Sequence, residues 1–198
     1  MKYTELLKNI QNPIFSIQDI KLMGYKVISS QLSSYAKKGQ IVRLKNGLYL
    51  IADKKNTAVI ENIALKMYEP SYISLEWALS MYGIIPEIVY NVTSITTKAT
   101  RKFKNGFGLF IYKTIKRNLF WGYKKEEKNN QMYLIAEPEK ALLDYIYFNL
   151  SKIKKTEAID ELRLNKSVIR GLNQTKLKKY QKIFNNKKIN KIIQEILK

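Results

Sequence analysis

The sequence of 198 residues contains no cysteine and no histidine, and only 4 prolines and 8 glycines. Without cysteine the chain has neither disulfides nor thiolate sites. Without histidine it lacks the commonest general base and the commonest metal ligand. Catalysis by Ser-His-Asp or Cys-His groups and by histidine-bound zinc is therefore excluded. Acidic residues are also scarce, because 16 Asp and Glu stand against 36 Lys and Arg.

Long hydrophobic runs are missing as well. No apolar stretch approaches the roughly 20 residues of a membrane span, and the start MKYTELLKNI lacks the apolar core of a signal peptide. We therefore expect a soluble cytoplasmic protein without membrane contact. The formal net charge of +20 favours a polyanionic partner, and both ends of the chain are more cationic than its middle. A bias towards Lys, Asn, Ile and Tyr is also what an AT-rich genome produces without selection for binding.

Two short helices are predicted at the start of the chain. The first covers residues 3–10 and ends before an Asn-Pro pair, which stops helices. The second begins after Ser16, a good N-cap to which Asp19 can bond back, and it ends at Gly24. We expect its buried side to consist of Ile17, Ile20 and Leu22.

A third helix with a polar face is predicted from about residue 29 to residue 38, in the segment SSQLSSYAKK. Helical spacing places four residues on one side, Ile28, Leu32, Tyr35 and Ala36. The opposite side carries Ser30, Ser34 and Lys37, with Gln31 and Lys38 at its margins. Short hydroxyl and amide groups let a helix enter the major groove of DNA, and lysine adds charge. A solvated polar surface is the alternative interpretation of this pattern.

A β-hairpin is predicted after the third helix. The strands IVRL and LYLI flank Lys45-Asn46-Gly47, and Asn-Gly between apolar strands is a strong hairpin signal. Arg43 and Lys45 then lie near the tip, where a wing contacts the phosphate backbone or the minor groove. Three helices and a basic hairpin together favour a winged helix-turn-helix over residues 1–52, and therefore binding to DNA.

The polar segment 53–56 is the predicted join to a second domain, residues 57–198. Here TAVIENIALKMY and SLEWALSMYG are predicted helices, the second capped by Ser74, and VYNVTSITT, FGLFIYKTI, NLFWGYK and QMYLIA alternate like strands. Another helix opens at Pro138. The predicted fold class is α+β: a winged helix-turn-helix, then a mixed α/β domain with an antiparallel sheet of about four strands. A basic helical tail at about 151–198 completes it.

Two features of the second domain could carry chemistry. Glu137 and Asp144 lie two turns apart on a predicted helix, whereas Glu139 points elsewhere and no glycine-rich phosphate loop accompanies them. Acidic side chains also favour the start of a helix without any catalysis. We therefore predict no catalytic, cofactor-binding or metal site. The Tyr and Phe residues of the strands are expected to form an aromatic core, the alternative being a platform that stacks on RNA bases.

Three segments in the middle of the chain resemble a known family in their order and spacing. They are SYISLEWALSMYGIIPE, VTSITTKATRKFKNGFGLFIYKTIKRNLFWGY and LIAEPEKALLDYIY. With the N-terminal module they make residues 1–150 similar to the AbiEi family of antitoxins, which belong to type IV toxin-antitoxin and abortive phage infection systems. Tyr82 stands where some relatives carry histidine, which suggests a structural role for that position.

The resemblance implies an N-terminal domain that represses its own operon by binding double-stranded DNA at inverted repeats in the promoter. It implies a C-terminal domain that counters a nucleotidyltransferase-like toxin without a stable complex. Inverted repeats require two copies, as monomers or as a dimer on the DNA. The implied groove-reading residues are Ser30, Gln31, Ser33, Ser34, Lys37 and Lys38. The implied wing residues are Arg43, Lys45 and Asn46.

The sequence thus supports three hypotheses of different classes. The leading one is a cytoplasmic antitoxin and transcriptional autorepressor without enzymatic activity. The second is an RNA-binding or toxin-binding module without operator specificity, which would use the aromatic sheet and the basic tail. The third is a divergent metal-dependent enzyme that uses Glu137 and Asp144.

Overall fold

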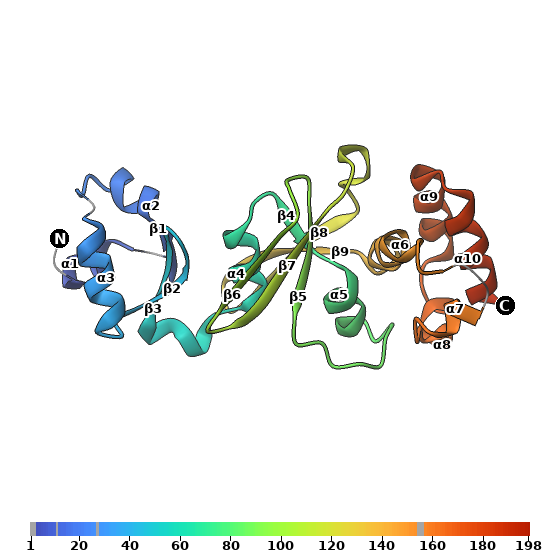
Figure 1. The fold of residues 1–198 in the computed structure, drawn as a ribbon, viewed down its shortest axis with the longest axis horizontal. Helices are drawn as coiled ribbons and strands as arrows, with labels where there is room; N and C mark the ends of the chain where they lie inside the picture. The colour runs from blue at the N-terminus through green and yellow to red at the C-terminus, as the bar shows by residue number, and fades with distance from the viewer. Residues whose placement is uncertain (1–2, 11, 27, 154–156) are drawn as a thin grey trace.

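A computed structural model of the protein describes residues 3–10, 12–26, 28–153 and 157–198. The fold is α+β and elongated (Figure 1). A three-helix module with a three-stranded sheet lies at one end, a six-stranded sheet lies in the middle, and the C-terminal helices lie at the other end.

The N-terminal module alternates helices with short strands. Its elements are α1 (Tyr3–Asn9), β1 (Ile14–Ser16), α2 (Ile17–Leu22), α3 (Ser29–Lys37), β2 (Ile41–Lys45) and β3 (Leu48–Ile51). The sheet is antiparallel, in the order β1-β3-β2. The predicted hairpin is confirmed: β2 and β3 are joined at Asn46-Gly47, where Gly47 has a φ of +76° that favours glycine.

The start of α2 follows the predicted capping pattern. The Asp19 amide donates to Ser16 Oγ over 3.1 Å, and the Ser16 amide donates to Asp19 Oδ2 over 2.6 Å. These two bonds satisfy backbone donors that a helix start otherwise leaves without partners. The capping box predicted from the sequence is therefore confirmed.

The three-stranded sheet of the module is buried on both faces. On one face Phe15, Tyr49 and Ile51 pack against the helices of the module. On the other face Ile14, Leu44, Leu48 and Leu50 join the core of the second domain. The side chains of β3 alternate between these two cores, as the period of a strand requires. The module and the second domain are thus joined through a shared sheet.

Two residues expected on buried helix faces are instead exposed. Leu22 is 79% exposed and Ile28 is 46% exposed. Leu22 is the last residue of α2, and Ile28 is the N-cap of α3. The prediction of burial was wrong: two residues differ by about 200° around a helix, so Leu22 lies opposite the buried Ile20, and Ile28 stands just outside α3.

The second domain begins after a 3-10 helix, η1 (Ala52–Thr57), at the predicted join. Its first elements are α4 (Ile60–Met67), β4 (Ser71–Ile73), α5 (Leu75–Met81), β5 (Val92–Thr96) and β6 (Arg101–Asn105). They are followed by β7 (Gly108–Thr114), η2 (Arg117–Leu119), β8 (Tyr123–Lys128), β9 (Gln131–Ala136) and α6 (Pro138–Asn149). Pro138 stands in the first turn of α6, as predicted.

The central sheet differs from the predicted antiparallel sheet of about four strands. It has six strands in the order β6-β7-β5-β4-β9-β8, and it is mixed because β5 pairs parallel to β7 and β4 pairs parallel to β9. The unpredicted strand β4 has only three residues and lies between two helices. The unpredicted strand β6 has the sequence RKFKN. Only Tyr123 and Lys124 of the predicted strand NLFWGYK belong to β8, because residues 117–119 form η2; β8 instead continues through KKEEK, which was expected to be a loop. Both β6 and β8 are edge strands, where charged side chains prevent pairing with other chains.

Helices cover both faces of the six-stranded sheet. On one face the Tyr112 hydroxyl of β7 donates to the Ala64 carbonyl of α4 over 2.6 Å. On the other face the Tyr72 hydroxyl of β4 donates to Asp144 of α6 over 3.1 Å. Tyr72, Phe110 and Tyr112 are fully buried under these helices. The predicted aromatic core is confirmed for them, and these rings are not available to stack on RNA bases.

A buried ion pair joins α6 to the sheet. The Lys140 ammonium pairs with the Asp144 carboxylate, and both side chains are 0% exposed. Asp144 also accepts from the Ser74 hydroxyl over 3.0 Å, and Lys140 donates to the Tyr72 hydroxyl over 2.8 Å. Ser74 was expected to cap α5 with its side chain, but the hydroxyl bonds to Asp144 instead. Gly122 leaves the space for Lys140, because a Cβ there would lie 3.1 Å from the lysine side chain.

The predicted helical tail consists of α7 (Glu157–Asp160), α8 (Lys166–Arg170), α9 (Gln174–Phe184) and α10 (Lys187–Leu197). Leu177 and Phe184 of α9 and Ile189 of α10 belong to the core of the second domain, so the tail is an integral part of the fold.

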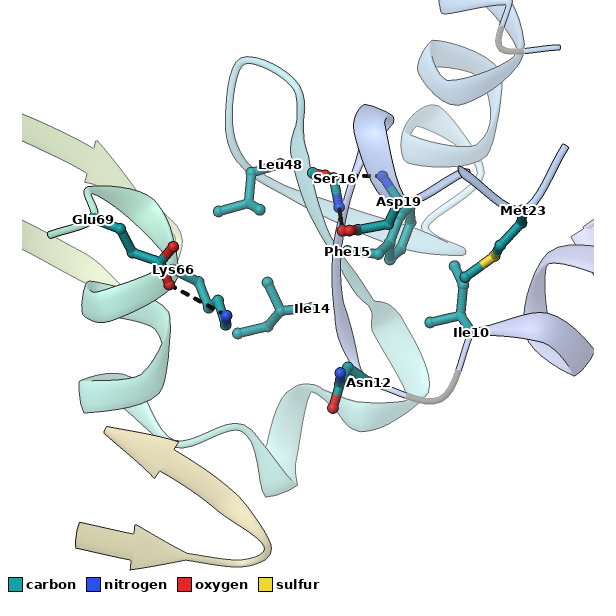
Figure 2. Close-up of a pocket in the computed structure, with 10 residues that line it drawn as sticks. All are labelled: Ile10, Asn12, Ile14, Phe15, Ser16, Asp19, Met23, Leu48, Lys66 and Glu69. Carbon is teal, nitrogen blue, oxygen red and sulfur yellow. Dashed lines mark hydrogen bonds and ion pairs between the residues drawn. The ribbon is translucent and has the colours of Figure 1, made fainter. Parts of the chain in front are cut away.

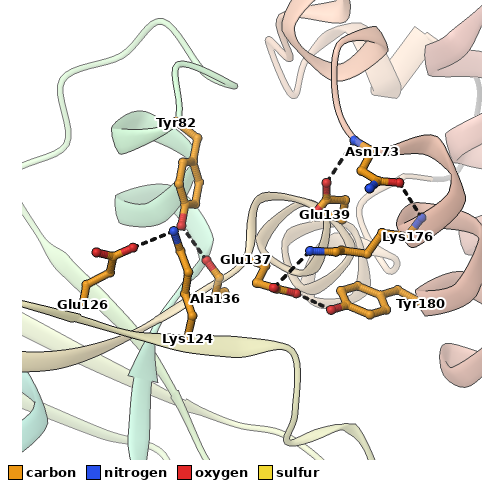
Figure 3. A network of polar contacts seen from close by, with 9 residues as sticks. All are labelled: Tyr82, Lys124, Glu126, Ala136, Glu137, Glu139, Asn173, Lys176 and Tyr180. Atoms are coloured by element: carbon orange, nitrogen blue, oxygen red, sulfur yellow. Dashed lines mark hydrogen bonds and ion pairs between the residues drawn. The ribbon is translucent and has the colours of Figure 1, made fainter.

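Polar contacts fasten α9 to the start of α6 (Figure 3). Lys176 donates to Glu137 over 3.1 Å, and the Tyr180 hydroxyl donates to the same carboxylate. The Asn173 amide donates to Glu139 over 3.0 Å. In the same view the Tyr82 hydroxyl donates to the Ala136 carbonyl over 2.8 Å, so Tyr82 is bound within the fold. Glu137 and Glu139 therefore connect the tail to α6.

Replacing Glu137 with glutamine is expected to loosen α9 and to remove its acid sensitivity. Burial raises the pKa of Glu137, but hydrogen bonds from Tyr180 and Lys176 outweigh it, and the net pKa lies below the ordinary value. A lowered pKa means that the stabilisation is present above the unfolded pKa of about 4.5 and is lost as the pH falls through the folded pKa.

Hydrogen exchange of the α9 amides, corrected for intrinsic rates, measures this effect between pH 7 and about pH 3. Protection of the wild type should fall with the pH, and protection of Glu137→Gln should be low throughout. Glu195→Gln, which removes a carboxylate paired with Lys198 on α10, is the matched control. Equal pH dependence of α9 protection in the wild type and Glu137→Gln would contradict this assignment.

Candidate nucleic-acid interface

The helix α3 presents a polar face to solvent. The Leu32 side chain of α3 is buried in the core of the N-terminal module, and α3 packs against β2. Four of the predicted groove-reading residues are exposed, Ser30, Ser33, Lys37 and Lys38. The other two, Gln31 and Ser34, are partly exposed. Five of the six therefore lie on the accessible side of α3, and Lys38 follows directly as its C-cap.

Two residues of the predicted wing lie together at the hairpin tip. Arg43 Nη2 donates to Asn46 Oδ1 over 3.0 Å, and both residues are exposed. This bond orients the guanidinium and leaves its other donors facing solvent, which suits contact with a phosphate. Arg43 therefore offers an exposed cation on the hairpin, which follows α3 directly in the chain.

Lys45, the third predicted wing residue, is placed differently. Its ammonium donates to the Met67 carbonyl at the end of α4 and lies 5.8 Å from the centre of the Phe103 ring. Burial and the nearby charge of Lys98 lower the pKa of Lys45. A contact to the second domain therefore holds the Lys45 side chain, whereas Arg43 and Asn46 are exposed. This contact could not be predicted from the sequence, because Met67 stands more than twenty residues away from Lys45.

Exposed apolar side chains next to α3 were not predicted as part of a site. Leu22, Met23 and Ile28 are exposed around the turn between α2 and α3. Apolar side chains at the edge of a major-groove reader can contact the methyl group of thymine. Their positions could have indicated exposure, because Leu22 lies opposite Ile20 on α2, and Met23 and Ile28 are helix caps.

A cleft of about 480 Å³ lies between the N-terminal module and α4 (Figure 2). Its polar residues include two pairs that already bind each other: Asp19 with the backbone of Ser16, and Lys66 with Glu69 over 3.2 Å. The remaining lining is largely apolar, with Ile14 and Leu48 from the shared sheet. The cleft therefore offers little free charge for a ligand.

The acidic residues considered for catalysis do not form a site together. Asp144 is fully buried with Lys140, whereas Glu137 bonds to Lys176 and Tyr180 of the tail. In the described part of the chain, no three Asp or Glu residues are grouped so that they could hold a metal ion.

No model of a known protein family matches this chain, and no curated protein matches it either. The resemblance to AbiEi antitoxins stays a prediction from the sequence. In the ranges that the structure describes, none of the helices combines the length and the apolar character that crossing a membrane requires.

Proposed function

We propose that this protein is a DNA-binding transcriptional repressor whose N-terminal module is a winged helix-turn-helix. The observation that carries the proposal is the outer face of α3, where short polar groups and Lys37 face solvent, with Lys38 directly after the helix and the exposed Arg43 on the hairpin that follows. The order of elements supports it, because α2 and α3 are followed directly by the hairpin of β2 and β3. The net charge of +20 agrees with a polyanionic partner.

The side chains divide into two roles in this proposal. Lys37, Lys38 and Arg43 contact phosphates, which supplies affinity and fixes the position of the helix on the duplex. Base edges are read by the small polar residues Ser30, Gln31, Ser33 and Ser34, whose short side chains let the backbone of α3 approach the groove floor. Asn46 keeps the guanidinium of Arg43 in place.

We further propose that the repressor is the antitoxin of a type IV toxin-antitoxin pair. On this reading it binds inverted repeats in its own promoter and counteracts a nucleotidyltransferase-like toxin without a stable complex. The support is the resemblance of SLEWAL, YGIIPE and EPEKALLD to AbiEi antitoxins. In this structure those segments build α5, the following loop and α6, which form the middle of the second domain.

Replacing Lys37 or Arg43 with alanine is expected to weaken binding to every DNA sequence. Each loss of a phosphate contact should reduce the slope of log K against log salt by about 0.9. The control is Lys45→Met. In the wild type the Lys45 ammonium bonds to the Met67 carbonyl, so replacing it with a methionine of similar length should leave the slope unchanged. Titrations at several salt concentrations measure it, and a change of slope for Lys45→Met as large as for Lys37→Ala would contradict the assignment.

Expression of a reporter from the promoter upstream of this gene tests the proposed function in cells. The wild type should repress the reporter. It should also restore growth to cells that express the proposed nucleotidyltransferase-like toxin from the neighbouring gene. A Lys37→Ala/Arg43→Ala variant should fail to repress but should still restore growth, because the antitoxin role is proposed for the second domain. Absence of both effects in the wild type would overturn the proposal.

A further inference from the structure

Two grooves meet at Glu76 on the side of the central sheet that α5 and α6 cover. The larger, of about 360 Å³, lies between the loop of residues 85–91 and Tyr145 of α6. The smaller, of about 220 Å³, leads to Ile111 and Lys113 of β7. Glu76, Val89 and Asn91 line both grooves.

One oxygen of Glu76 is buried without a partner. Among the described residues nothing donates a hydrogen bond to its Oε2 atom. A buried carboxylate oxygen without a donor is costly, and native structures rarely contain one without a reason. Burial and the negative charges of Glu76 and Glu87 raise the pKa of the Tyr145 hydroxyl. Within the described residues this one oxygen of Glu76 therefore lacks a hydrogen-bond donor.

The backbone before Glu76 is strained. Leu75, the first residue of α5, is fully buried and has a φ of +58°, a region that leucine rarely adopts. Thr93 holds this turn, since its hydroxyl donates to the Ser74 carbonyl over 2.7 Å and accepts from the Trp77 amide over 3.0 Å. Strain of this kind persists where the surroundings impose it and is concentrated at functional sites.

The rim of the larger groove is apolar and acidic. Ile88 is 79% exposed and Tyr90 is 81% exposed. Glu87 and Glu161 also line this groove, and the one cation among its lining residues, Arg163, is paired with Glu87 over 2.8 Å. In the smaller groove Lys113 lies over the Phe148 ring, 5.4 Å from its centre. On a chain with a net charge of +20, this surface is suited to a cation and not to a phosphate.

We propose that this groove binds an arginine side chain of a partner protein. The guanidinium supplies the donors that Glu76 lacks, and its planar fork bonds to a carboxylate with two parallel hydrogen bonds. It also stacks on aromatic rings, which Tyr90 and Tyr145 provide at the groove. In the partner protein, apolar residues next to the arginine would pack on the exposed Ile88 side chain. The inference does not depend on the proposed function, because it concerns another surface.

Nuclear magnetic resonance titrations of the full chain test this proposal with two peptides. The first is acetyl-Leu-Arg-Leu-amide, and the second replaces arginine with citrulline, which has nearly the same shape but no charge. We expect saturable shifts of the Glu76, Asn91 and Tyr145 amides with the arginine peptide, and we expect the citrulline peptide to bind at least about tenfold more weakly. The net charge of +20 repels a cationic peptide, so saturable binding of the arginine peptide near Glu76 requires specific contacts in the groove.

Variants test the Glu76 carboxylate and the apolar rim of the groove separately. Glu76→Gln should weaken the arginine peptide about tenfold and abolish its advantage over citrulline. Ile88→Ser should weaken both peptides alike. Glu126→Gln, which removes an exposed carboxylate paired with Lys124 on β8, should change neither. The proposal is overturned by equal binding of the two peptides, by an unchanged affinity in Glu76→Gln, or by a single-stranded oligonucleotide that shifts the same amides more strongly.

Discussion

Replacing Asp144 with asparagine is expected to lower the free energy of unfolding by about 3–5 kcal/mol, because it leaves a buried ammonium without an anion. Lys140 is 0% exposed, and the rings of Tyr72, Trp121 and Phe184 lie 5.3, 5.2 and 5.1 Å from its Nζ. Burial lowers the pKa of Lys140 and raises the pKa of Asp144, and the attraction between the two charges opposes both shifts. Each charge therefore depends on the other.

A double variant distinguishes this pairing from simple packing. Lys140→Met/Asp144→Asn contains no buried charge at this place, and its asparagine can still accept from the Tyr72 and Ser74 hydroxyls. It should be more stable than Asp144→Asn, as measured by chemical denaturation with tryptophan fluorescence. The exposed pair Lys66 and Glu69 is the control, and breaking it should cost less than about 1 kcal/mol. Costs that simply add in the double variant would contradict the coupling.

Truncating Leu50 to alanine is expected to destabilise both halves of the protein, by about 2–5 kcal/mol in total. The side chain is fully buried and points from β3 into the core of the second domain, whereas its neighbours Tyr49 and Ile51 point into the N-terminal module. A cavity under the shared sheet weakens the contact on which both cores rest.

Hydrogen exchange resolves this effect along the chain. In Leu50→Ala, exchange should become faster both in α3 and in β5. Leu32→Ala is the matched control, because Leu32 is equally buried but belongs to the core of the module alone. Its effect should be concentrated in α1 to α3. If Leu50→Ala accelerates exchange in only one half, the shared sheet does not couple the two.

Helix caps, the hairpin turn and helix starts could be predicted from the sequence. The capping box of Ser16 and Asp19, the turn at Asn46-Gly47 and the start of α6 at Pro138 all lie where the sequence predicts them. Each depends on residues within a few positions, so the pattern contains the whole interaction. The helices α3, α4 and α5 were likewise predicted, because their apolar residues recur at helical spacing.

Long-range pairing was not readable. The edge strand β6, RKFKN, is mostly basic and shows no alternation of apolar residues, and β4 has only three residues. The alternation that does mark β5 and β9 says nothing about neighbours, so their parallel partners could not be inferred. The same limit applies to the candidate site: the outer face of α3 followed from helical period, whereas the bond from Lys45 to Met67 depends on the packing of two domains.

The most direct test of the central claim is a fluorescence anisotropy titration with a duplex from the promoter of this gene and a shuffled duplex of equal composition, at about 150 mM salt. The wild type is predicted to prefer the promoter about a thousandfold or more. A folded variant that lacks Lys37, Lys38 and the Arg43 guanidinium should bind both duplexes weakly. Equal affinity of the wild type for the two duplexes, or unchanged binding by this variant, would contradict the proposal that α3 and the hairpin read DNA.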